Sequence, residues 1–550
     1  MRLPTRARVL AIAAAAAPAA LAAQTPSNLG PRIDAIFARF DDTSPGCAVG
    51  LARDGRPLYT HGYGLANLEY RVPLTDSTVL ESGSVAKQFT ASALVLLQQD
   101  GKLSLDDDIR KYLPEVPSFG GQKITIRNLL THTSGLRDQW GLLGIEGLGP
   151  GTQVHSAMTT LDLVAHQKML NFPVGSEYLY SNTGYALAGL IVQRVSGKSL
   201  DEFTQERLFR PLGMKHTQWR DDFTEVVPNR ATAYSGRPGA GYHTDMPFTN
   251  MIGNGGVLST MSDLLEWNEN LDNPKIGGRA YAEEMQTVMH LTSGRAIDYA
   301  LGLTVGDYRG VREVSHNGST AGYQTYLGRF PEQHVSLAVW CNYTGANPGA
   351  LAHKVADLVL NFPALAVTQA KAERVKIPAS SLQRWIGTYR NSHTDQTQSF
   401  TVVDGSLKST VVWAPRGGSR FTAVNGSGDV EFGGQPGSRS FTLARQGGDT
   451  LRFEEVRPAA SPVPASDYAG EYVSDELDVH LTVIARGGKI LVRRRPADEF
   501  ELRPVYADDF QSPRNSGLGT IRFRRDASGK VSGFSVYAGR VLDVRFRRRF

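Results

Sequence analysis

Residues 81–90, Glu-Ser-Gly-Ser-Val-Ala-Lys-Gln-Phe-Thr, contain the pair of side chains on which the interpretation of the chain depends. Ser84 stands three positions before Lys87, and apolar residues recur at helical spacing up to Asp100-Gly101, which predicts a helix over residues 85–99. Two side chains three residues apart share one helix face, so the lysine amine can take the serine proton once burial lowers its pKa. The pair alone is weak evidence, because a chain this long contains about one such pair by chance.

A second polar element, Tyr180-Ser181-Asn182, lies between a Pro/Gly turn at residues 172–175 and a predicted helix at residues 183–195. In one interpretation Ser181 or Asn182 caps that helix and Tyr180 packs in the core. In the other, Tyr180 relays a proton and Asn182 donates its amide to a substrate. The two interpretations are compatible, because residues at a helix N-terminus are well placed to face a cleft.

A third element, His-Asn-Gly-Ser at residues 316–319, lies between two strand-like runs. Taken alone it is more typical of a turn, although its glycine lets a ligand approach the strand backbone closely. The order and spacing of the three elements together resemble the signature of the penicillin-recognising serine hydrolases. The match is closest to the class C β-lactamase-like branch, which includes D-stereospecific aminopeptidases, D-Ala-D-Ala carboxypeptidases and esterases.

Two further phrases agree with this resemblance, Leu-Leu-Thr-His-Thr-Ser-Gly-Leu at residues 129–136 and Gly-Asn-Gly-Gly at residues 253–256. The resemblance covers about residues 30–365. It implies an α/β (α+β) β-lactamase-like fold, in which a mixed sheet with flanking helices adjoins a helical subdomain and the site lies between them.

The resemblance also assigns roles by position. Ser84 would attack a carbonyl to form an acyl-enzyme, Lys87 would activate it, and Tyr180 would pass the proton to the leaving group. Asn182 would hold the substrate amide, and the backbone N–H groups of Ser84 and Ser319 would form the oxyanion hole. This chemistry requires no metal and no organic cofactor. The chain has no Gly-x-Ser-x-Gly and no His-Glu-x-x-His, so α/β-hydrolase and zincin mechanisms lack their central residues.

One position departs from the β-lactamases of this group, which usually have lysine where His316 stands. Histidine is mostly neutral at pH 7, so His316 and Gly318 should bind a substrate carboxylate less strongly than a Lys-x-Gly element would. We therefore expect a small peptide, amide or ester substrate and D-aminopeptidase, amidase or esterase activity ahead of β-lactamase or carboxypeptidase activity. A slowly or non-hydrolysing cell-wall or β-lactam sensor is the alternative from another class.

After residue 370 the helical periodicity gives way to short alternating segments that are typical of an all-β region. Residues 382–389 and 465–472 share an aromatic residue, a glycine and a tyrosine at equal spacing, with an offset of 83 residues. This repeat predicts two small β-barrels, although two halves of one barrel would look similar. The expected domains are a hydrolase at 24–368 and barrels at 375–460 and 465–550.

The first 23 residues have the order of a secretory signal peptide: basic residues, an alanine-rich run and a small-residue end. We therefore expect export to the periplasm or the medium. Removing the three arginines of this segment lowers the formal charge from +5 to +2, which does not indicate a nucleic-acid partner, and no transmembrane anchor is expected. Cys47 and Cys341 exclude a disulfide scaffold and a four-thiolate zinc site; they form either one disulfide or two buried thiols.

Overall fold

The structure is a computed structural model that describes residues 28–360, 362, 378–424, 428–444, 450–457, 459, 464–495 and 498–549. The signal peptide expected at residues 1–23 lies outside the described residues. Within them, no helix is long and apolar enough to cross a membrane.

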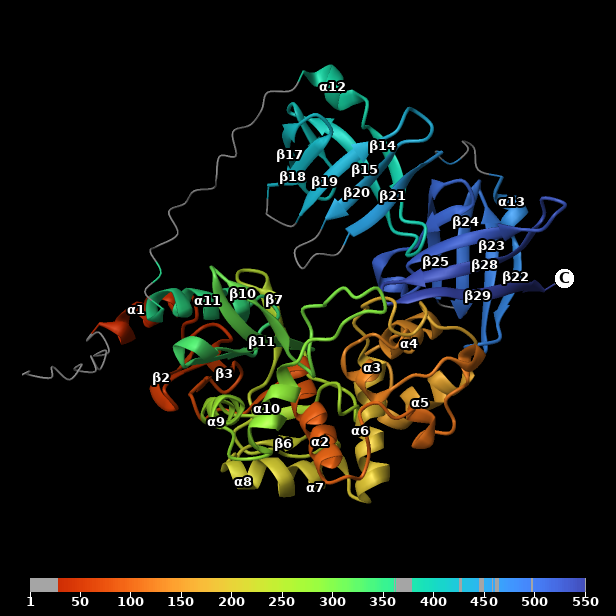
Figure 1. Ribbon diagram of the computed structural model, residues 1–550. Coiled ribbons are helices and arrows are strands. Elements are labelled where there is room, and N and C mark those ends of the chain that lie inside the picture. The colour runs from red at the N-terminus through yellow and green to blue at the C-terminus, as the bar shows by residue number, and fades with distance from the viewer. Residues whose placement is uncertain are drawn as a thin grey trace, which may run out of the picture.

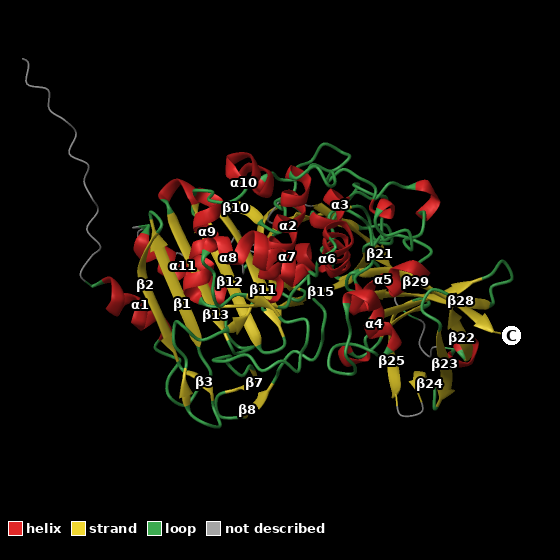
Figure 2. Cartoon of the chain, turned by 90° about the horizontal axis from the view of Figure 1, so that it is seen from below, coloured by secondary structure: helices red, strands yellow, loops and turns green. Residues whose placement is uncertain are grey.

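A six-stranded sheet forms the centre of the N-terminal domain, and all five of its strand pairings are antiparallel. Figure 2 shows these strands lying side by side. Their order is β10 (Thr304–Tyr308), β11 (Val311–Thr320), β12 (Tyr323–Phe330), β13 (Val335–Cys341), β1 (Cys47–Arg53) and β2 (Arg56–Tyr63). The β1–β13 pairing joins the beginning of the domain to its end. The register pairs Cys47 with Cys341, and the two residues form a disulfide.

Helices cover both faces of this sheet, because its central strands are buried on both sides. On one face, α1 (Leu29–Phe37) and α11 (Pro348–Val359) share an apolar cluster with β1 and β13. On the other face, α9 (Met261–Asp272) contacts β1 and β13 and belongs to a larger core with α2 (Lys87–Gln99). The predicted helix at 85–99 is confirmed as α2, preceded by a 3₁₀ turn at Gly83–Ala86.

A helical region adjoins the sheet and completes the core around α2. The other predicted helix, at residues 183–195, is confirmed as α6, and it packs against α2. The elements of this region are α3 (Ile126–Leu130), α4 (Gln139–Glu146), α5 (Ala157–His166), α6 (Asn182–Ser196), α7 (Leu200–Thr204), α8 (Arg210–Leu212) and α10 (Gly278–Gln286). Three small sheets connect it to the rest, formed by β3 (Leu65–Asn67) with β4 (Val72–Pro73), β5 (Leu80–Glu81) with β9 (Val257–Ser259) and β6 (Gln218–Trp219), and β7 (Tyr234–Arg237) with β8 (Gly241–Thr244).

Two closed eight-stranded antiparallel barrels follow, so the interpretation as two barrels is confirmed (Figure 1). The first, preceded by α12 (Ala379–Gln383), consists of β14 (Gly387–Arg390), β15 (Thr397–Val403), β16 (Ser406–Lys408), β17 (Val412–Gly417), β18 (Arg420–Ala423), β19 (Asp429–Gly433), β20 (Ser440–Ala444) and β21 (Thr450–Val456). The second, preceded by α13 (Ala465–Tyr468), consists of β22 (Gly470–Ser474), β23 (Val479–Arg486), β24 (Lys489–Arg495), β25 (Asp498–Tyr506), β26 (Asp509–Gln511), β27 (Thr520–Arg525), β28 (Val531–Ala538) and β29 (Val541–Arg549). The second barrel lies over α4 and α5 (Figure 1).

Candidate active site

The 3₁₀ turn before α2 places Ser84 and Lys87 next to each other. Lys87 Nζ lies 3.0 Å from Ser84 Oγ, and it donates to Asn182 Oδ1 at 2.9 Å and to the carbonyl oxygen of Asn254 at 2.7 Å. The oxygens of Asn182 and Asn254 therefore hold the amine beside the hydroxyl of Ser84, within the distance that a proton transfer requires.

Lys87 is fully buried, and burial lowers the pKa of its amine well below the usual 10.5. The carboxylate of Asp138 opposes this shift, and the guanidinium of Arg540 adds to it. A lowered pKa gives the amine a neutral fraction near pH 7. In that form the amine has a lone pair that can accept a proton.

Tyr180 lies two residues before α6, and its ring faces the lysine amine. Its ring centroid is 4.9 Å from Lys87 Nζ and 4.1 Å from the ring centroid of His132. Burial raises the pKa of the Tyr180 phenol above its usual 10, against a smaller opposing effect of a hydrogen bond with Ser84. The phenol is therefore protonated at neutral pH, which suits a group that passes a proton on rather than a phenolate base.

Asn182 begins α6, and the capping residue comes from another helix. Asp138 Oδ2 accepts hydrogen bonds from the backbone N–H of Asn182 at 2.7 Å and from its Nδ2 at 3.0 Å. Ser181 occupies the N-cap position, but its side chain makes no capping hydrogen bond. Since Asn182 Oδ1 accepts from Lys87, the second hydrogen on Nδ2 is what this side chain can offer to a ligand.

His316 lies on β11 and is a neutral imidazole. Its Nε2 is 2.8 Å from the hydroxyl of Tyr299, and its Nδ1 is 2.5 Å from the carbonyl oxygen of Asn317. Burial lowers the pKa of His316 to about 3, with a further contribution from the charge of Lys87. The expected loss of a cation at this position therefore follows from burial as well as from residue type.

Gly318 is needed at this place because β11 passes close to the nucleophile turn. A Cβ atom on Gly318 would lie 2.1 Å from the carbonyl oxygen of Ser82. Gly83, which has φ +49°, meets the strand from the other side, since its Cβ would lie 2.5 Å from Ser319 N. The two glycines thus bring the backbone N–H groups of Ser84 and Ser319 to one edge of the site.

The residues predicted for the site surround one cavity of about 940 Å³, with Lys87 buried beneath its wall. They are Ser84, Tyr180, Asn182, His316, Gly318 and Ser319. The structure thus collects side chains from α6, β11 and the turn before α2.

Several residues around the cavity were not predicted. Asp138 and Asn254 hold Asn182 and Lys87, and Asn254 lies in the 253–256 phrase, which was the signal available for it. Tyr299, Asp245 and Arg540 also line the cavity. No motif marks any of these three in the sequence.

A buried lysine beside a serine hydroxyl, on a helix that packs against an antiparallel sheet, defines a serine hydrolase of the β-lactamase and penicillin-binding protein type. The family model for beta-lactamases matches residues 33–361, and the chain belongs to that family.

Relatives share more than this domain. A D-aminopeptidase from Brucella anthropi is 26% identical over 526 residues, which cover 92% of this chain and 95% of the relative. Among solved structures, the octameric penicillin-binding protein homologue from Pyrococcus abyssi is 26% identical with a TM-score of 0.56, covering 78% of this chain and 99% of that one. The D-amino acid amidase from Ochrobactrum anthropi SV3, complexed with L-phenylalanine amide, is 25% identical with a TM-score of 0.52, covering 61% and 99%.

Proposed function

We propose that the protein is an exported serine hydrolase that cleaves a small amide or ester, with aminoacyl amides of D configuration as the preferred class. The observation that carries the proposal is the 3.0 Å contact between the buried amine of Lys87 and Ser84 Oγ. The similarity to a D-aminopeptidase over both the hydrolase domain and the barrels supports the substrate class.

The reaction begins when neutral Lys87 takes the proton of Ser84 and Oγ attacks the substrate carbonyl carbon. The negative charge on the carbonyl oxygen is stabilised by the backbone N–H groups of Ser84 and Ser319. Tyr180 passes the proton to the leaving nitrogen or oxygen, the bond to that atom breaks, and an acyl ester remains on Ser84. Water then attacks the ester, gives its proton back through the same groups and releases the acid.

The walls of the cavity fit an acyl group with an amine and an apolar side chain. Asp245 lines the cavity and forms no ion pair with any described residue, so its carboxylate suits a free α-amino group. Trp140, Met246 and Phe248 line the same cavity and provide apolar contact. In contrast, Glu81 is already paired with Arg220 and is not available to a ligand.

Export is supported by two independent features. The first 23 residues have the order of a signal peptide, and Cys47 is bonded to Cys341, a linkage that persists in oxidising compartments.

The experiment is to measure turnover of D- and L-aminoacyl amides and short esters, together with the intact mass of the protein after reaction with an acylating probe. We expect wild-type Ser84 to be labelled, and Ser84→Ala to lose labelling and at least about 1000-fold of kcat while remaining folded. Ser82→Ala is the matched control, since this hydroxyl lies on the same turn but bonds only to the carbonyl of Gly83.

Retained turnover in Ser84→Ala would contradict the proposal. A stable mass gain on Ser84 without product release, across amides, esters and a β-lactam, would favour the sensor alternative instead.

A further inference from the structure

One wall of the cavity comes from the second barrel. Of the described residues that line the cavity, Arg540 alone follows Pro348 in the sequence. Arg540 and Gly539 form the two-residue turn between β28 and β29, and Gly539 has φ +63°, as the first position of a type II′ turn requires. A barrel hairpin therefore places a guanidinium at the active site.

The turn is fastened to the catalytic domain through its backbone. The carbonyl oxygen of Arg540 accepts from Asn171 Nδ2 at 2.9 Å and from Asp138 N at 3.4 Å, and Leu542 N donates to Asn171 Oδ1 at 2.8 Å. Because these bonds use main-chain atoms of the turn, they persist when the Arg540 side chain is replaced.

Arg137 of the catalytic domain also binds this hairpin, at the first residues of β29. Its guanidinium is fully buried, donates at 3.0 Å to the carbonyl oxygens of Leu542 and Asp543, and forms an ion pair with Glu476, two residues after β22. Val541 packs in one apolar cluster with Leu142 of α4. The hairpin is thus preorganised, and the Arg540 guanidinium has a defined place.

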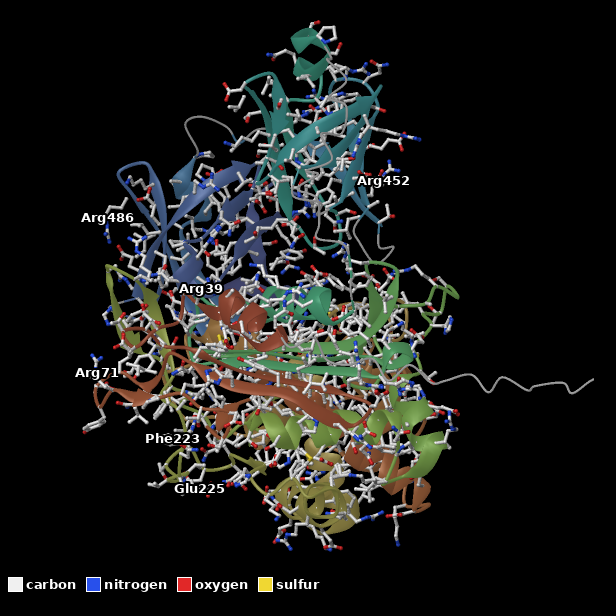
Figure 3. The ribbon with its side chains drawn as sticks, turned by 90° about the vertical axis from the view of Figure 1, so that its left-hand side faces the viewer. Arg39, Arg71, Phe223, Glu225, Arg452 and Arg486 are labelled. Carbon is white, nitrogen blue, oxygen red and sulfur yellow. A yellow bond between two sulfur atoms is a disulfide. The ribbon has the colours of Figure 1, made fainter. Side chains whose placement is uncertain are left out.

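That guanidinium has donors to spare. Its side chain is 46% exposed, and it makes no hydrogen bond to a described residue. Asp138 Oδ2 lies 3.7 Å from Nη1, and the Asp138 carboxylate already accepts from the backbone N–H of Trp140 and twice from Asn182. Arg486 of the same barrel, in contrast, extends outward and pairs with Glu499 (Figure 3).

The position of Arg540 indicates that it contacts the leaving group of the substrate rather than the acyl group. Its guanidinium carbon is 4.6 Å from the ring centroid of Tyr180, the residue that protonates the leaving atom in the proposed reaction. In an amino acid leaving group, the carboxylate carbon is about 2.5 Å from the leaving nitrogen across two bonds. A guanidinium beside that nitrogen is within reach of such a carboxylate and matches it with two parallel hydrogen bonds.

We infer that Arg540 binds a free carboxylate on the leaving group, so that the preferred substrates are short peptides that release an amino acid rather than simple amides. The inference rests on the proposed function. It makes Arg540 the cation that neutral His316 does not provide. Arg540 and Asp245 together line the cavity with one positive and one negative side chain, which suits a substrate with both an amine and a carboxylate.

The test compares two substrates that share an acyl group, D-alanyl-glycine and D-alanyl-glycinamide, together with their L counterparts. We expect wild-type kcat/KM to favour the carboxylate by about 10- to 100-fold. Arg540→Gln should reduce this ratio to about one, and Arg540→Lys should retain part of it as a point charge. The matched control is Arg547→Gln on β29, the strand that follows the turn, where the guanidinium pairs with exposed Asp475 and the ratio should stay at the wild-type value.

A wild-type ratio near one, or a preference that survives in Arg540→Gln, would overturn the inference and leave the proposed function standing. Labelling of Ser84 and cleavage of simple amides or esters, without cleavage of either peptide, would do the same. If Ser84 is not labelled and no amide or ester is cleaved, the proposed function fails and the inference fails with it.

Discussion

Among the described residues, the hydrophobic core of the first barrel contains only side chains of residues 382–453, whereas that of the second barrel extends into the catalytic domain. Leu142, Leu143 and Ile145 of α4 and Leu163 of α5 belong to the second core. The first barrel reaches the catalytic domain through an exposed pair, His393 and Glu177 at 3.4 Å. Two copies of one fold therefore serve differently, one as an appended unit and one as part of the active-site wall.

The largest effect on stability should come from removing a buried aromatic ring from the core of each barrel. Phe441→Ala in the first barrel and Phe534→Ala in the second each remove a fully buried ring, at a cost of about 3–5 kcal/mol. We expect the first variant to keep its activity on the carboxylate-bearing peptide, and the second to lose the preference for that substrate, because only the second barrel positions Arg540. Hydrogen exchange with mass spectrometry locates the destabilised barrel, and turnover is measured beside it. Equal loss of activity in both variants would abolish the distinction.

A smaller effect is expected from the polar side-chain contacts that connect each barrel to the catalytic domain. Glu476→Gln leaves the buried charge of Arg137 without its carboxylate, and we expect the free energy of unfolding to fall by about 2–3 kcal/mol, since the amide oxygen still accepts a hydrogen bond. Glu177→Gln, at the exposed contact of the first barrel, should change stability by less than about 0.5 kcal/mol. Urea titration measures both, and a cost at Glu177 as large as at Glu476 would contradict the comparison.

Where the barrels meet each other, stability should depend on pH. Burial, together with the charge of Asp395 from the first barrel, raises the pKa of Asp509 from 3.8 to about 8. Neither oxygen of Asp509 accepts a hydrogen bond from a described residue, which fits a carboxyl that holds a proton toward Asp395. A raised folded pKa stabilises the protein fully below about pH 4, and this contribution is lost as the pH rises through about 8.

Asp509→Asn should therefore be more stable than the wild type at pH 9, by about 1–2 kcal/mol, and should lack this decline. The neighbouring Asp508→Asn is the control. Burial is the largest single influence on the pKa of Asp508 and raises it, but the hydrogen bonds from Arg525 and Tyr468, together with the charges of Arg525 and Arg522, outweigh burial and lower the pKa. Melting temperatures at pH 5 and pH 9 test the prediction. A wild-type protein whose stability rises over that interval as much as that of Asp509→Asn would refute it.

The smallest difference between the barrels is expected at a hydrogen bond that both of them contain. Tyr389 donates to the carbonyl oxygen of Trp385 at 3.0 Å, and Tyr472 donates to that of Tyr468 at 2.7 Å, so the repeated residues make the same bond in both copies. Tyr389→Phe and Tyr472→Phe should each cost about 0.5–1.5 kcal/mol. Thermal unfolding compares them, and a clearly larger cost in one copy would mean that the repeat is no longer equivalent.

Local patterns predicted much of this molecule. The helices at α2 and α6 and the two barrels follow from periodicity and from an 83-residue repeat, and the spacing of Ser84 and Lys87 predicted their contact. The pairing of Cys47 with Cys341 remained open, because it depends on the register of strands from the two ends of the domain.

Arg540 was beyond prediction for a related reason. A Gly-Arg pair in a two-residue turn is common, and no pattern near it in the sequence indicates that Arg540 lies beside Tyr180. The same holds for Asp138, whose capping of α6 depends on how two helices pack. Gly318 was predicted to admit a ligand, whereas its own chain occupies that space.

The position of the β28–β29 hairpin in the sequence also determines when the active site can be completed during synthesis. Ser84, Lys87 and Tyr180 are synthesised long before Arg540, which follows Asn171 by 369 residues. At about 5–20 residues per second, roughly 20–70 s pass between the synthesis of Asn171, which binds the hairpin, and the synthesis of the hairpin itself. During that interval the cavity lacks Arg540 and the apolar side chains of α4 lack their partners in the second barrel, so synthesis of this barrel is the last step in assembling the described active site.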